Sequence, residues 1–427
     1  MKTVIPNKSK IERISILILL LMSFLSVNAH NLSAQKDGNW STNSTWRGGS
    51  SPTASDNVTI ESGVTLTVDV ARATCSSLTF TDNTGVAKLV LISGKTLVIT
   101  GAVTLSTDAG STGILDMTNG GTLECGSITI GNGTATFIPG TGTIQLNATN
   151  TLPLSNFNNL IINSGTTTIT ANITVTGNLL NNSSLNENLN TISLIGTSAQ
   201  MVSGVNFYDL IVNNSYSGDA VSLESETIIS NSLILTRGII NASTFPITLG
   251  SSSTVSGASN SSHIKGIIKK IVTSNTSFSF PCGNSSFYRP IEIINPSNDT
   301  WSASYNRFGY GTTPKNIKST DSVVLNHASS LEYWEISPLT KGSKTKISLS
   351  WDEYSNTGSL AGLMIAHWNN TIMQWENIGS ISANSGTKRI TSKVSWSTFS
   401  PFTFGSTEED ISLPIELDDF KATVRRK

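Results

Sequence analysis

The chain has 427 residues, of which 13% are charged and 7% aromatic, and its formal net charge is −1. This length exceeds what one hydrophobic core usually covers, so we expect two or three domains. Ser, Thr, Asn and Gly are abundant. Because these residues are poor helix formers, the composition excludes a mainly helical protein and favours all-β structure outside the cell. The absence of clustered Lys and Arg argues against nucleic acid as a partner.

The N-terminus has the pattern of a secretory signal peptide. Positive charges between Lys2 and Arg13 precede an apolar run over residues 14–25, and small residues follow it. We expect residues 1–29 to be removed by cleavage after Ala29, with Ala34 as second choice. The run is shorter than the ~20 residues that a spanning helix needs, so we expect no membrane span after cleavage.

Two tryptophans, Trp40 and Trp46, precede the first predicted strand at residues 57–60. We interpret them as a cap over the first coil of a repetitive β-structure, whose end would otherwise expose apolar side chains. A ligand site is the alternative. Together with Pro52 and the Asp-Asn-Val-Thr-Ile sequence at 56–60, they resemble the opening of secreted bacterial β-helix proteins, including those called G8-like.

Short segments recur in the part of the chain that precedes residue 270. A Gly-x-Thr-Leu pattern occupies residues 63–66, 94–97 and 120–123, at steps of 31 and 26. A longer pattern, Phe-x-x-Leu-Ile-x-Asn, occupies residues 157–163 and 207–213, fifty residues apart. Repeats at such periods are typical of solenoids, in which each unit buries its apolar face against its neighbours.

Between the turns, Ile, Leu and Val alternate with Thr and Ser, as half-buried strands require. We predict a right-handed parallel β-helix over residues 36–270, with a series of antiparallel sandwiches as the alternative. A fifty-residue block would hold about two coils. This alignment places Leu160, Ile162, Leu210 and Val212 inward on adjacent turns.

The sequence changes character near residue 270, give or take ten residues. Six of the eight tryptophans lie between Trp301 and Trp396, among strands expected near 333–336, 346–351, 363–368 and 400–404. We predict an antiparallel β-sandwich-like module over residues 271–405, with a second core of bulkier side chains.

Several segments resemble the module that precedes the sorting tail in secreted substrates of the type IX system. They are 280–283 (Phe-Pro-Cys-Gly), 288–290 (Tyr-Arg-Pro), 333–334 (Tyr-Trp), 351–352 (Trp-Asp), 366–368 (Ala-His-Trp), Trp375 and 399–402 (Phe-Ser-Pro-Phe). Residues 406–427, with Leu-Pro-Ile-Glu-Leu at 413–417, are similar to the linker and the truncated start of that sorting domain. The resemblance implies secretion or display on the outer surface of a Gram-negative bacterium.

Three cysteines, Cys75, Cys125 and Cys282, are too few and of odd number for a disulfide framework. Cys75 and Cys125 are fifty residues apart, so two interpretations stay open. They either pair on stacked coils or, as we favour, are buried thiols.

Polysaccharide cleavage on a β-helix needs converging carboxylates, or a base beside a bound cation. Glu224 and Glu226 are two residues apart and are predicted to share a strand face, with Arg237 eleven residues beyond. The other acids are spread one or two per coil, mostly at turns where Asp is favoured for backbone reasons. They are Asp56, Glu61, Asp69, Asp82, Asp108, Asp116 and Glu124.

The histidines His30, His263, His327 and His367 stand singly, without metal-binding or nucleophile motifs. His367 beside Trp368 is interpreted as a packed strand histidine, with ligand contact as the alternative. We therefore predict no catalytic residue, no metal and no cofactor.

A third hypothesis concerns hydroxyl groups. Threonines between residues 166 and 176 would form a flat array resembling surfaces that bind ice or crystalline polysaccharide, although Thr is also simply a good strand former. The residues are Thr166, Thr167, Thr168, Thr170, Thr174 and Thr176.

The sequence as a whole predicts a non-enzymatic structural or adhesion protein, whose partners are cell-surface glycans or other extracellular polymers. A lyase or glycoside hydrolase is the first alternative, and an ice- or glycan-binding surface is the second.

Overall fold

The computed structural model describes residues 29–80, 83–308, 310, 318–319, 324–399 and 401–408. Residues 1–28 of the expected signal peptide and residues 409–427 of the expected linker lie outside this part. The described residues form a parallel β-solenoid of right-handed type, with about 11 turns, which confirms the predicted β-helix. Only two short 3₁₀ helices interrupt the described strands, η1 (Asn43–Thr45) and η2 (Glu353–Ser355).

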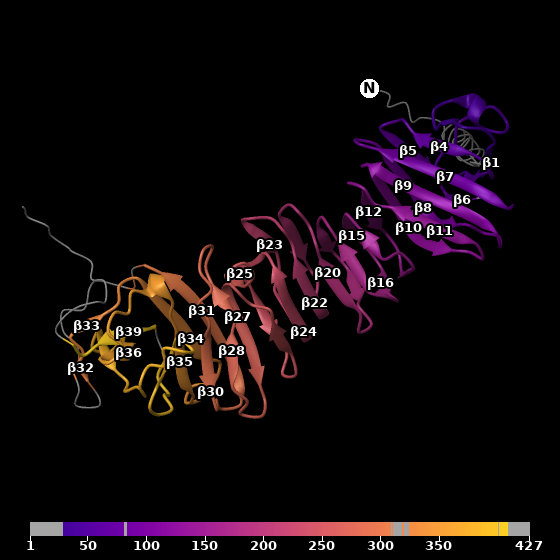
Figure 1. Cartoon of the computed structure of the whole chain (residues 1–427). Helices are drawn as coiled ribbons and strands as arrows, with labels where there is room; N and C mark the ends of the chain where they lie inside the picture. Colours follow the sequence, from indigo (N-terminus) through magenta and orange to yellow (C-terminus); the bar gives the residue numbers. More distant parts are fainter. Residues whose placement is uncertain are drawn as a thin grey trace, which may run out of the picture. The chain divides into compact units, whose positions relative to one another are not determined.

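No helix within the described ranges has the length and hydropathy needed to cross a membrane. The chain divides into two compact units, residues 1–142 and 143–427. Each unit is described separately below, and Figure 1 labels its strands.

The first unit contains two parallel sheets. One is formed by β1 (Asn31–Ala34), β3 (Asn57–Ile60), β5 (Arg72–Cys75), β6 (Ser77–Phe80), β8 (Thr96–Leu105) and β10 (Thr122–Ile130). The other is formed by β2 (Gly38–Asn39), β4 (Thr65–Val68), β7 (Gly85–Ile92), β9 (Ser111–Asn119) and β11 (Thr134–Ile138).

Apolar side chains of the first unit stack in columns, because parallel in-register pairing places equivalent residues directly above one another. One column runs through Leu32, Val58, Leu78, Val103 and Ile128. All five side chains are buried. Each contributes roughly 1.5–3 kcal/mol relative to an exposed position, so the alternation of apolar and hydroxyl residues largely determines the fold.

The Gly-x-Thr-Leu repeat is only partly a structural repeat. Leu97 pairs with Leu123, so the step from the second copy to the third is one coil. Leu66 of the first copy instead pairs with Leu89 on the other sheet, so the first copy does not stack on the second. The coils differ in length, as the pairs Asn57–Ser77 and Gly38–Leu66 show, and each is shorter than the step between these two copies. The step from Leu66 to Leu97 is therefore longer than one coil, and Leu97 lies on the sheet that does not contain Leu66.

The second unit continues with parallel strands in three ladders. The first is β12 (Thr143–Leu146), β15 (Asn159–Ile162), β18 (Leu179–Asn181), β21 (Gln200–Ser203), β23 (Asp219–Leu223), β25 (Ile239–Leu249), β27 (Ile264–Val272) and β29 (Cys282–Gly283). The second is β14 (Asn156–Phe157), β17 (Ile173–Val175), β20 (Thr191–Leu194), β22 (Phe207–Asn213), β24 (Thr227–Arg237) and β26 (Thr254–Ser256). The third is β13 (Asn150–Leu152), β16 (Thr166–Ile169) and β19 (Ser184–Asn186).

The fifty-residue repeat does not stack on itself. Leu160, Ile162, Leu210 and Val212 are all buried, as predicted. However, Leu160 pairs with Leu179 in the first ladder, whereas Leu210 belongs to the second, so their predicted positions on adjacent turns are wrong. The alignment fails because the coils differ in length.

Coils of the second unit also vary in length, from the short coil between Ile144 and Leu160 to the longer one between Leu210 and Leu233. The offset of the Phe repeat is therefore not a whole number of coils, and the repeated strand arrives on a different ladder. The larger offset between Val175 and Leu235 does correspond to three coils, through Leu194 and Val212.

After β27 the pairing becomes antiparallel. One group is β31 (Asp299–Arg307), β34 (Glu332–Pro338), β39 (Phe402–Ser406), β36 (Leu363–Asn369) and β37 (Gln374–Asn377), with β33 (His327–Ala328) on β39 and β32 (Lys318–Ser319) parallel to β37. A separate sheet contains β28 (Phe278–Phe280), β30 (Ile291–Ile294), β35 (Lys346–Ser350) and β38 (Arg389–Thr391).

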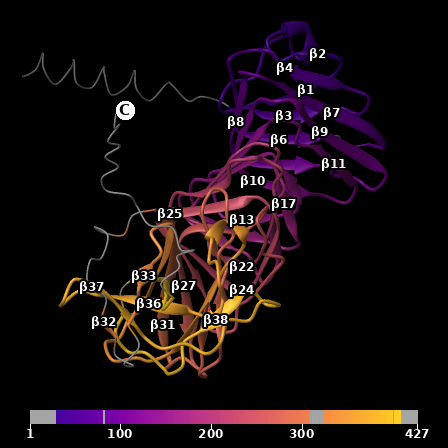
Figure 2. The ribbon, with the colours of Figure 1, turned by 60° about the vertical axis from the view of Figure 1, so that its left-hand side comes forward.

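Strand β27 joins the two modes of pairing. Its residue Ile268 pairs in parallel with Ile247 of β25 and antiparallel with Ala303 of β31. Figure 2 shows β31 beside β27. The strands beyond β27 carry the bulkier core that the tryptophan distribution predicts, since Trp301, Trp334 and Phe404 are fully buried.

Asparagine amides form a ladder along the solenoid of the second unit. Asn163 donates from its side-chain amide to Asn147 at 3.1 Å, and Asn182 donates to Asn163 at 3.1 Å. Such bonds join successive coils outside the backbone ladder, so the abundance of Asn reflects more than turn formation.

We predict that cysteines replacing Asn163 and Asn182 form a disulfide under oxidising conditions. Parallel neighbours lie ~4.8 Å apart, within the Cα separation that a disulfide allows. The matched control replaces Asn163 and Asn213, which the fifty-residue alignment would superimpose. Mobility on non-reducing gels checks the result, and bonding in the control pair alone would contradict the observed register.

Candidate functional site

The acidic and basic residues singled out in the solenoid do not converge. Glu224 and Glu226 lie in the connection between β23 and β24 rather than on a shared strand face, so that prediction is wrong. Glu226 lies 3.9 Å from the ammonium of Lys269, and its side chain is 70% exposed. Arg237 ends β24, at the opposite end of that strand from Glu226. The Ser residues around Glu224 and Glu226 favour a turn, so the short alternation of side chains there does not form a strand.

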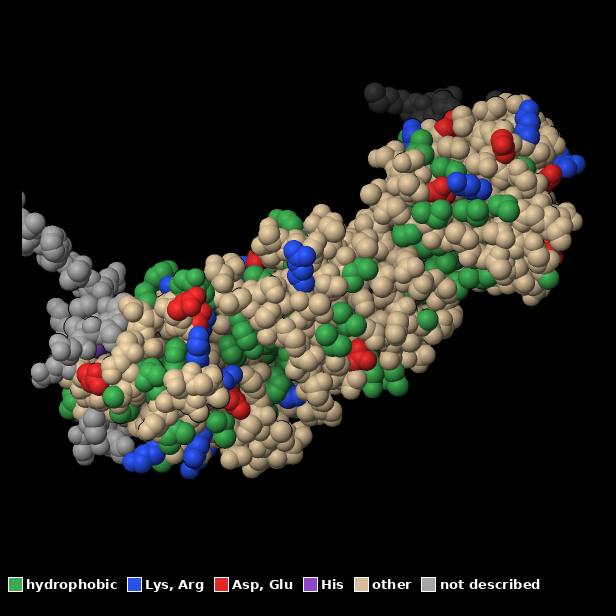
Figure 3. Space-filling model, in the orientation of Figure 1, with side chains coloured by type: hydrophobic (Ala, Val, Ile, Leu, Met, Phe, Trp, Pro, Cys, Tyr) green, Lys and Arg blue, Asp and Glu red, His purple; other side chains and the backbone are tan. Residues whose placement is uncertain are grey.

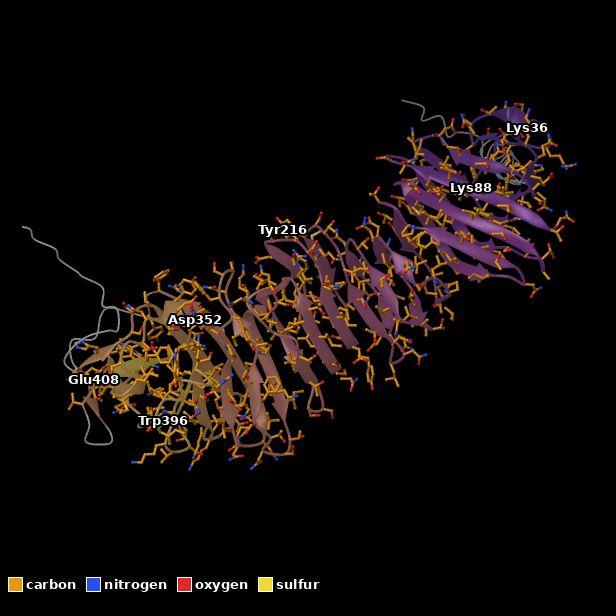
Figure 4. All side chains as sticks on the ribbon, in the orientation of Figure 1. Lys36, Lys88, Tyr216, Asp352, Trp396 and Glu408 are labelled. Carbon is orange, nitrogen blue, oxygen red and sulfur yellow. The ribbon has the colours of Figure 1, made fainter. Side chains whose placement is uncertain are left out.

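Other solenoid acids form ion pairs with basic residues on different coils. Lys88 and Asp116 form an ion pair of 2.6 Å between β7 and β9, and Arg72 reaches Glu124 at 3.3 Å. Figure 4 labels Lys88 on its strand. Burial alone would raise the pKa of Asp116, but its bonds to Lys88 and Thr118 outweigh this effect and lower the pKa to about 2. The Asp116 carboxylate is therefore held ionised in a structural contact.

Asp56 fastens the start of the described chain to the loop before β3. Its carboxylate accepts hydrogen bonds from the backbone N–H groups of His30 and Thr53, at 2.9 and 2.7 Å, and from the Thr53 hydroxyl at 2.7 Å. Burial would raise the pKa of Asp56, but these bonds outweigh burial and lower it to about 2.

We predict that Asp56→Asn lowers the free energy of unfolding by about 1–3 kcal/mol at pH 7, because charge-assisted bonds to a buried acceptor are lost. The folded pKa lies below the ordinary value of 3.8. The stabilisation is therefore present above that value and lost as pH falls through about 2. Urea denaturation of the full chain at neutral and acidic pH measures the difference. Asp108→Asn is the control, and an equal effect at all pH values would contradict the assignment.

His367 is a packed strand histidine, the interpretation that the sequence favoured. It is buried on β36, its Nδ1 lies 2.9 Å from Glu376, and its ring packs against Phe402 at 4.9 Å between centroids. Burial lowers the pKa of His367, opposed by Glu376. His263 is also buried, with both ring nitrogens within hydrogen-bond distance of backbone carbonyl oxygens.

The threonines do not form one flat array. Thr167 is buried, and Thr166 and Thr168 lie on β16 opposite Ser184 and Asn186. Thr174 and Thr176 belong to the region of β17, which is in another ladder. Period-two alternation turns successive threonines to opposite faces, so a run of threonines cannot present a single surface.

The cysteines are all free and buried. Cys75 and Cys125 both pair with Ile99, one on each side, so they stand in one column two strands apart. That separation of ~10 Å is too large for a disulfide. Burial raises the pKa of both thiols to about 12.

Seven of the eight tryptophans are buried and pack as core residues. Trp40 and Trp46 are buried with ring centroids 5.1 Å apart, and the Trp46 indole donates to the Trp40 carbonyl at 2.9 Å. This packing favours the predicted cap over a ligand site. Trp334 packs against Phe404 at 5.3 Å in the antiparallel part.

A buried ionic network surrounds Arg289, and no sequence pattern signalled it. This side chain donates to Glu332 at 3.1 Å and also to Asp352, while the Tyr305 hydroxyl donates to Glu332 at 2.7 Å. Arg289 and Glu332 are almost completely buried. Two segments of the family resemblance contain residues of this network, Tyr-Arg-Pro with Arg289 and Trp-Asp with Asp352.

We predict that Arg289→Met destabilises the second unit by about 3–5 kcal/mol, because it leaves the Glu332 carboxylate buried without its counter-ion. The double variant with Glu332→Gln should recover part of this loss. Chemical denaturation followed by tryptophan fluorescence reports on this region, which holds most of the tryptophans.

The control is Lys269→Met, which removes a partly exposed pair and should cost under about 1 kcal/mol. Equal losses in Arg289→Met and Lys269→Met would show that the network has no special role.

A cleft of about 430 Å³ lies where β27 and β31 separate. Along β27, Ile264 and Lys265 pair with β29, whereas Ile268 pairs with β31. The sheet therefore forks between Lys265 and Ile268. Residues lining this fork cleft include Lys265, Asn284, Tyr305, Asn306, Arg307 and Glu335.

Aromatic rings hold Arg307 in place beside the fork cleft. Its guanidinium carbon lies 4.3 Å from the Phe287 ring centroid and 5.2 Å from that of Phe308. Phe308 is 63% exposed and has a φ of 66°, a strained conformation for an aromatic residue. Such strain is often found at functional positions.

The charges around the fork cleft have both signs. Lys265 lies 2.6 Å from Asp219, and Glu335 lines the opposite wall. Figure 3 shows blue and red side chains interspersed on the visible face of the second unit. The amide groups and the Arg307 guanidinium in this lining suit the binding of a polar ligand. The residues that the structure describes contain no group of three or more His, Cys, Asp or Glu able to hold a metal.

Comparison with models of protein families, with curated proteins and with solved structures finds no significant match.

Proposed function

We propose that the protein is a non-enzymatic structural or adhesion protein, secreted or displayed on the outer surface of a Gram-negative bacterium. In this proposal the solenoid is a scaffold, and its partners are glycans or other extracellular polymers. The signal-peptide pattern and the resemblance to type IX substrates support the location.

The observation that carries the proposal is how the solenoid uses its charged groups. Lys88 with Asp116, Arg72 with Glu124, and Lys265 with Asp219 each connect different coils. Catalysis needs such groups directed together at a substrate. Here they stabilise the stacking of coils, which is the requirement of a scaffold.

We propose that the strands after β27 form a sandwich that closes the C-terminal end of the solenoid. Two antiparallel sheets follow β27, and the edge of β27 is paired with β31. Arg289, just before β30, bonds to Glu332 of β34 and so connects the regions of both sheets. Pairing a solenoid edge in this way removes a site of aggregation.

The fork cleft supports binding as the mode of action. Arg307 lines the fork cleft, and its contacts with the Phe287 and Phe308 rings hold it there. An immobilised guanidinium loses little entropy when it bonds to a ligand hydroxyl.

We predict that the purified protein is retained by polysaccharides from a panel of acidic and neutral polymers, without producing new reducing or unsaturated ends. Arg307→Ala should weaken retention about fivefold or more, because it removes charge-assisted hydrogen bonds from the guanidinium to the polymer, which contribute at least about 1 kcal/mol. Arg237→Ala, at an exposed arginine outside the fork cleft, is the binding control.

Turnover of any polymer that Glu224→Gln, Glu226→Gln or Arg237→Ala abolishes would overturn the proposal in favour of a lyase or hydrolase. Binding that all three variants leave unchanged supports an adhesive role.

A further inference from the structure

A second cleft, of about 410 Å³, lies at the other end of β27 from the fork. It is bounded by the connection between β25 and β26, by residues 270–272 of β27, and by the chain leading into β28. We call it the lysine cleft, because Lys270 is the only charged residue among its lining.

Lys270 occupies a position that the repeat assigns to an aliphatic side chain. It pairs with Leu249, which in turn stands in register with Ile229. Both of these are fully buried, and Lys270 itself is only 6% exposed. A lysine here introduces a buried positive charge into an apolar column.

Neutral groups alone hold this ammonium. Nζ donates to the carbonyl oxygens of Gly250 and Ser253, at 2.6 and 2.8 Å, with further contacts to Ser251 and the Ser253 hydroxyl. It also lies 5.1 Å from the Phe278 ring centroid. Within the described residues, no ion pair neutralises Lys270, although each of its neighbours Lys265 and Lys269 faces a carboxylate.

Charged groups also lie on the elements packed against the lysine cleft. Asp299 of β31 pairs with Val272, and its carboxylate accepts hydrogen bonds from Thr340 and Ser343. From β38, Arg389 reaches the Ser279 hydroxyl at 3.1 Å on the cleft wall. Its partner Glu292 on β30 lies 3.4 Å from that same arginine. The lining of the lysine cleft carries one positive charge and no negative charge, so an anion entering it would be attracted.

Most of the other polar groups in the lysine cleft are hydroxyls. Nine of the lining residues are Ser or Thr, and exposed ones on both rims include Ser252, Thr273 and Thr276. Hydroxyls donate to anions and also accept from sugar hydroxyls. The volume falls within the ~300–1,000 Å³ of small-molecule sites.

We propose that the lysine cleft binds a sugar unit bearing an oxyanion, such as the uronic acid residue of an acidic polysaccharide. The hydroxyls contact the ligand, and Lys270, whose protons all point to protein acceptors, acts through its charge. This inference rests on the proposed adhesive function and specifies an acidic polymer for it.

The test is saturation-transfer NMR with the full chain and four separate probes: sodium glucuronate, glucose 6-sulfate, glucose and inorganic sulfate. Binding of both acidic sugars, without binding of glucose or free sulfate, is expected. Comparison of the two acidic sugars distinguishes a carboxylate from a sulfate ester as the natural group.

The variant Ser252→Asp places a carboxylate on the exposed rim and should weaken glucuronate binding about fivefold or more through repulsion. Ser252→Asn is the matched neutral control and should bind as the unchanged protein does. Lys270→Met should abolish binding, and Lys269→Met should not.

Burial lowers the pKa of Lys270 to about 8. Glucuronate binding should therefore fall as pH rises through that value, while the ligand stays ionised. Binding that Ser252→Asp and pH leave unchanged would overturn the proposal, as would equal binding of glucose or a lack of binding at millimolar concentrations.

The two proposals can fail separately. Retention of neutral polymers without glucuronate binding would overturn this inference and leave the adhesive function standing. Glucuronate binding without retention of any polymer would overturn the adhesive function instead.

Discussion

In-register parallel pairing between coils is the constraint on which this structure depends. It places each inward residue above its equivalent, so columns such as Ile173, Ile192 and Leu210 must remain aliphatic along the stack. A polar side chain in the interior can satisfy the backbone of neighbouring coils. Gln200 does this by donating to the carbonyls of Val175 and Gly177, at 3.0 and 2.5 Å. An interior polar residue here is therefore specified by its partners on the adjacent coil.

Parallel stacking also leaves the backbone groups at the end of a stack unpaired. In the second unit one such edge is paired at β27. Antiparallel pairing with β31 satisfies the free edge, and the core changes from aliphatic columns to Trp301 and Trp334. Rings of this size do not repeat in a column at ~4.8 Å spacing without staggering. The change in side-chain size thus accompanies the change in pairing, and Arg289 with Glu332 fixes the elements beyond it.

Sequence patterns predicted the burial of individual residues better than their neighbours in space. Alternation placed Leu160 and Val212 inward because the pleat itself has period two. The fifty-residue repeat predicted the wrong contacts, since coil length varies with each turn and similarity records ancestry or composition rather than register. Glu224 and Glu226 were misplaced for a related reason, because a short alternating segment cannot reveal where its strand ends. Arg289, Glu332 and Asp352 are far apart in the sequence, and only folding brings them together.

The charged groups of the scaffold and the charged group of the lysine cleft have different partners. Across the solenoid, low charge content means that most ionised groups can be paired between coils, as Lys88 and Asp116 are. A pair of this kind is stable when ionised and has little attraction left for a ligand. Lys270 differs because carbonyl dipoles solvate its charge without neutralising it. Dipoles lower the cost of burial, but the net charge persists at a distance. Burying a lysine among neutral groups lowers the stability of the core. This loss of stability is explained if the charge attracts a ligand from outside the core.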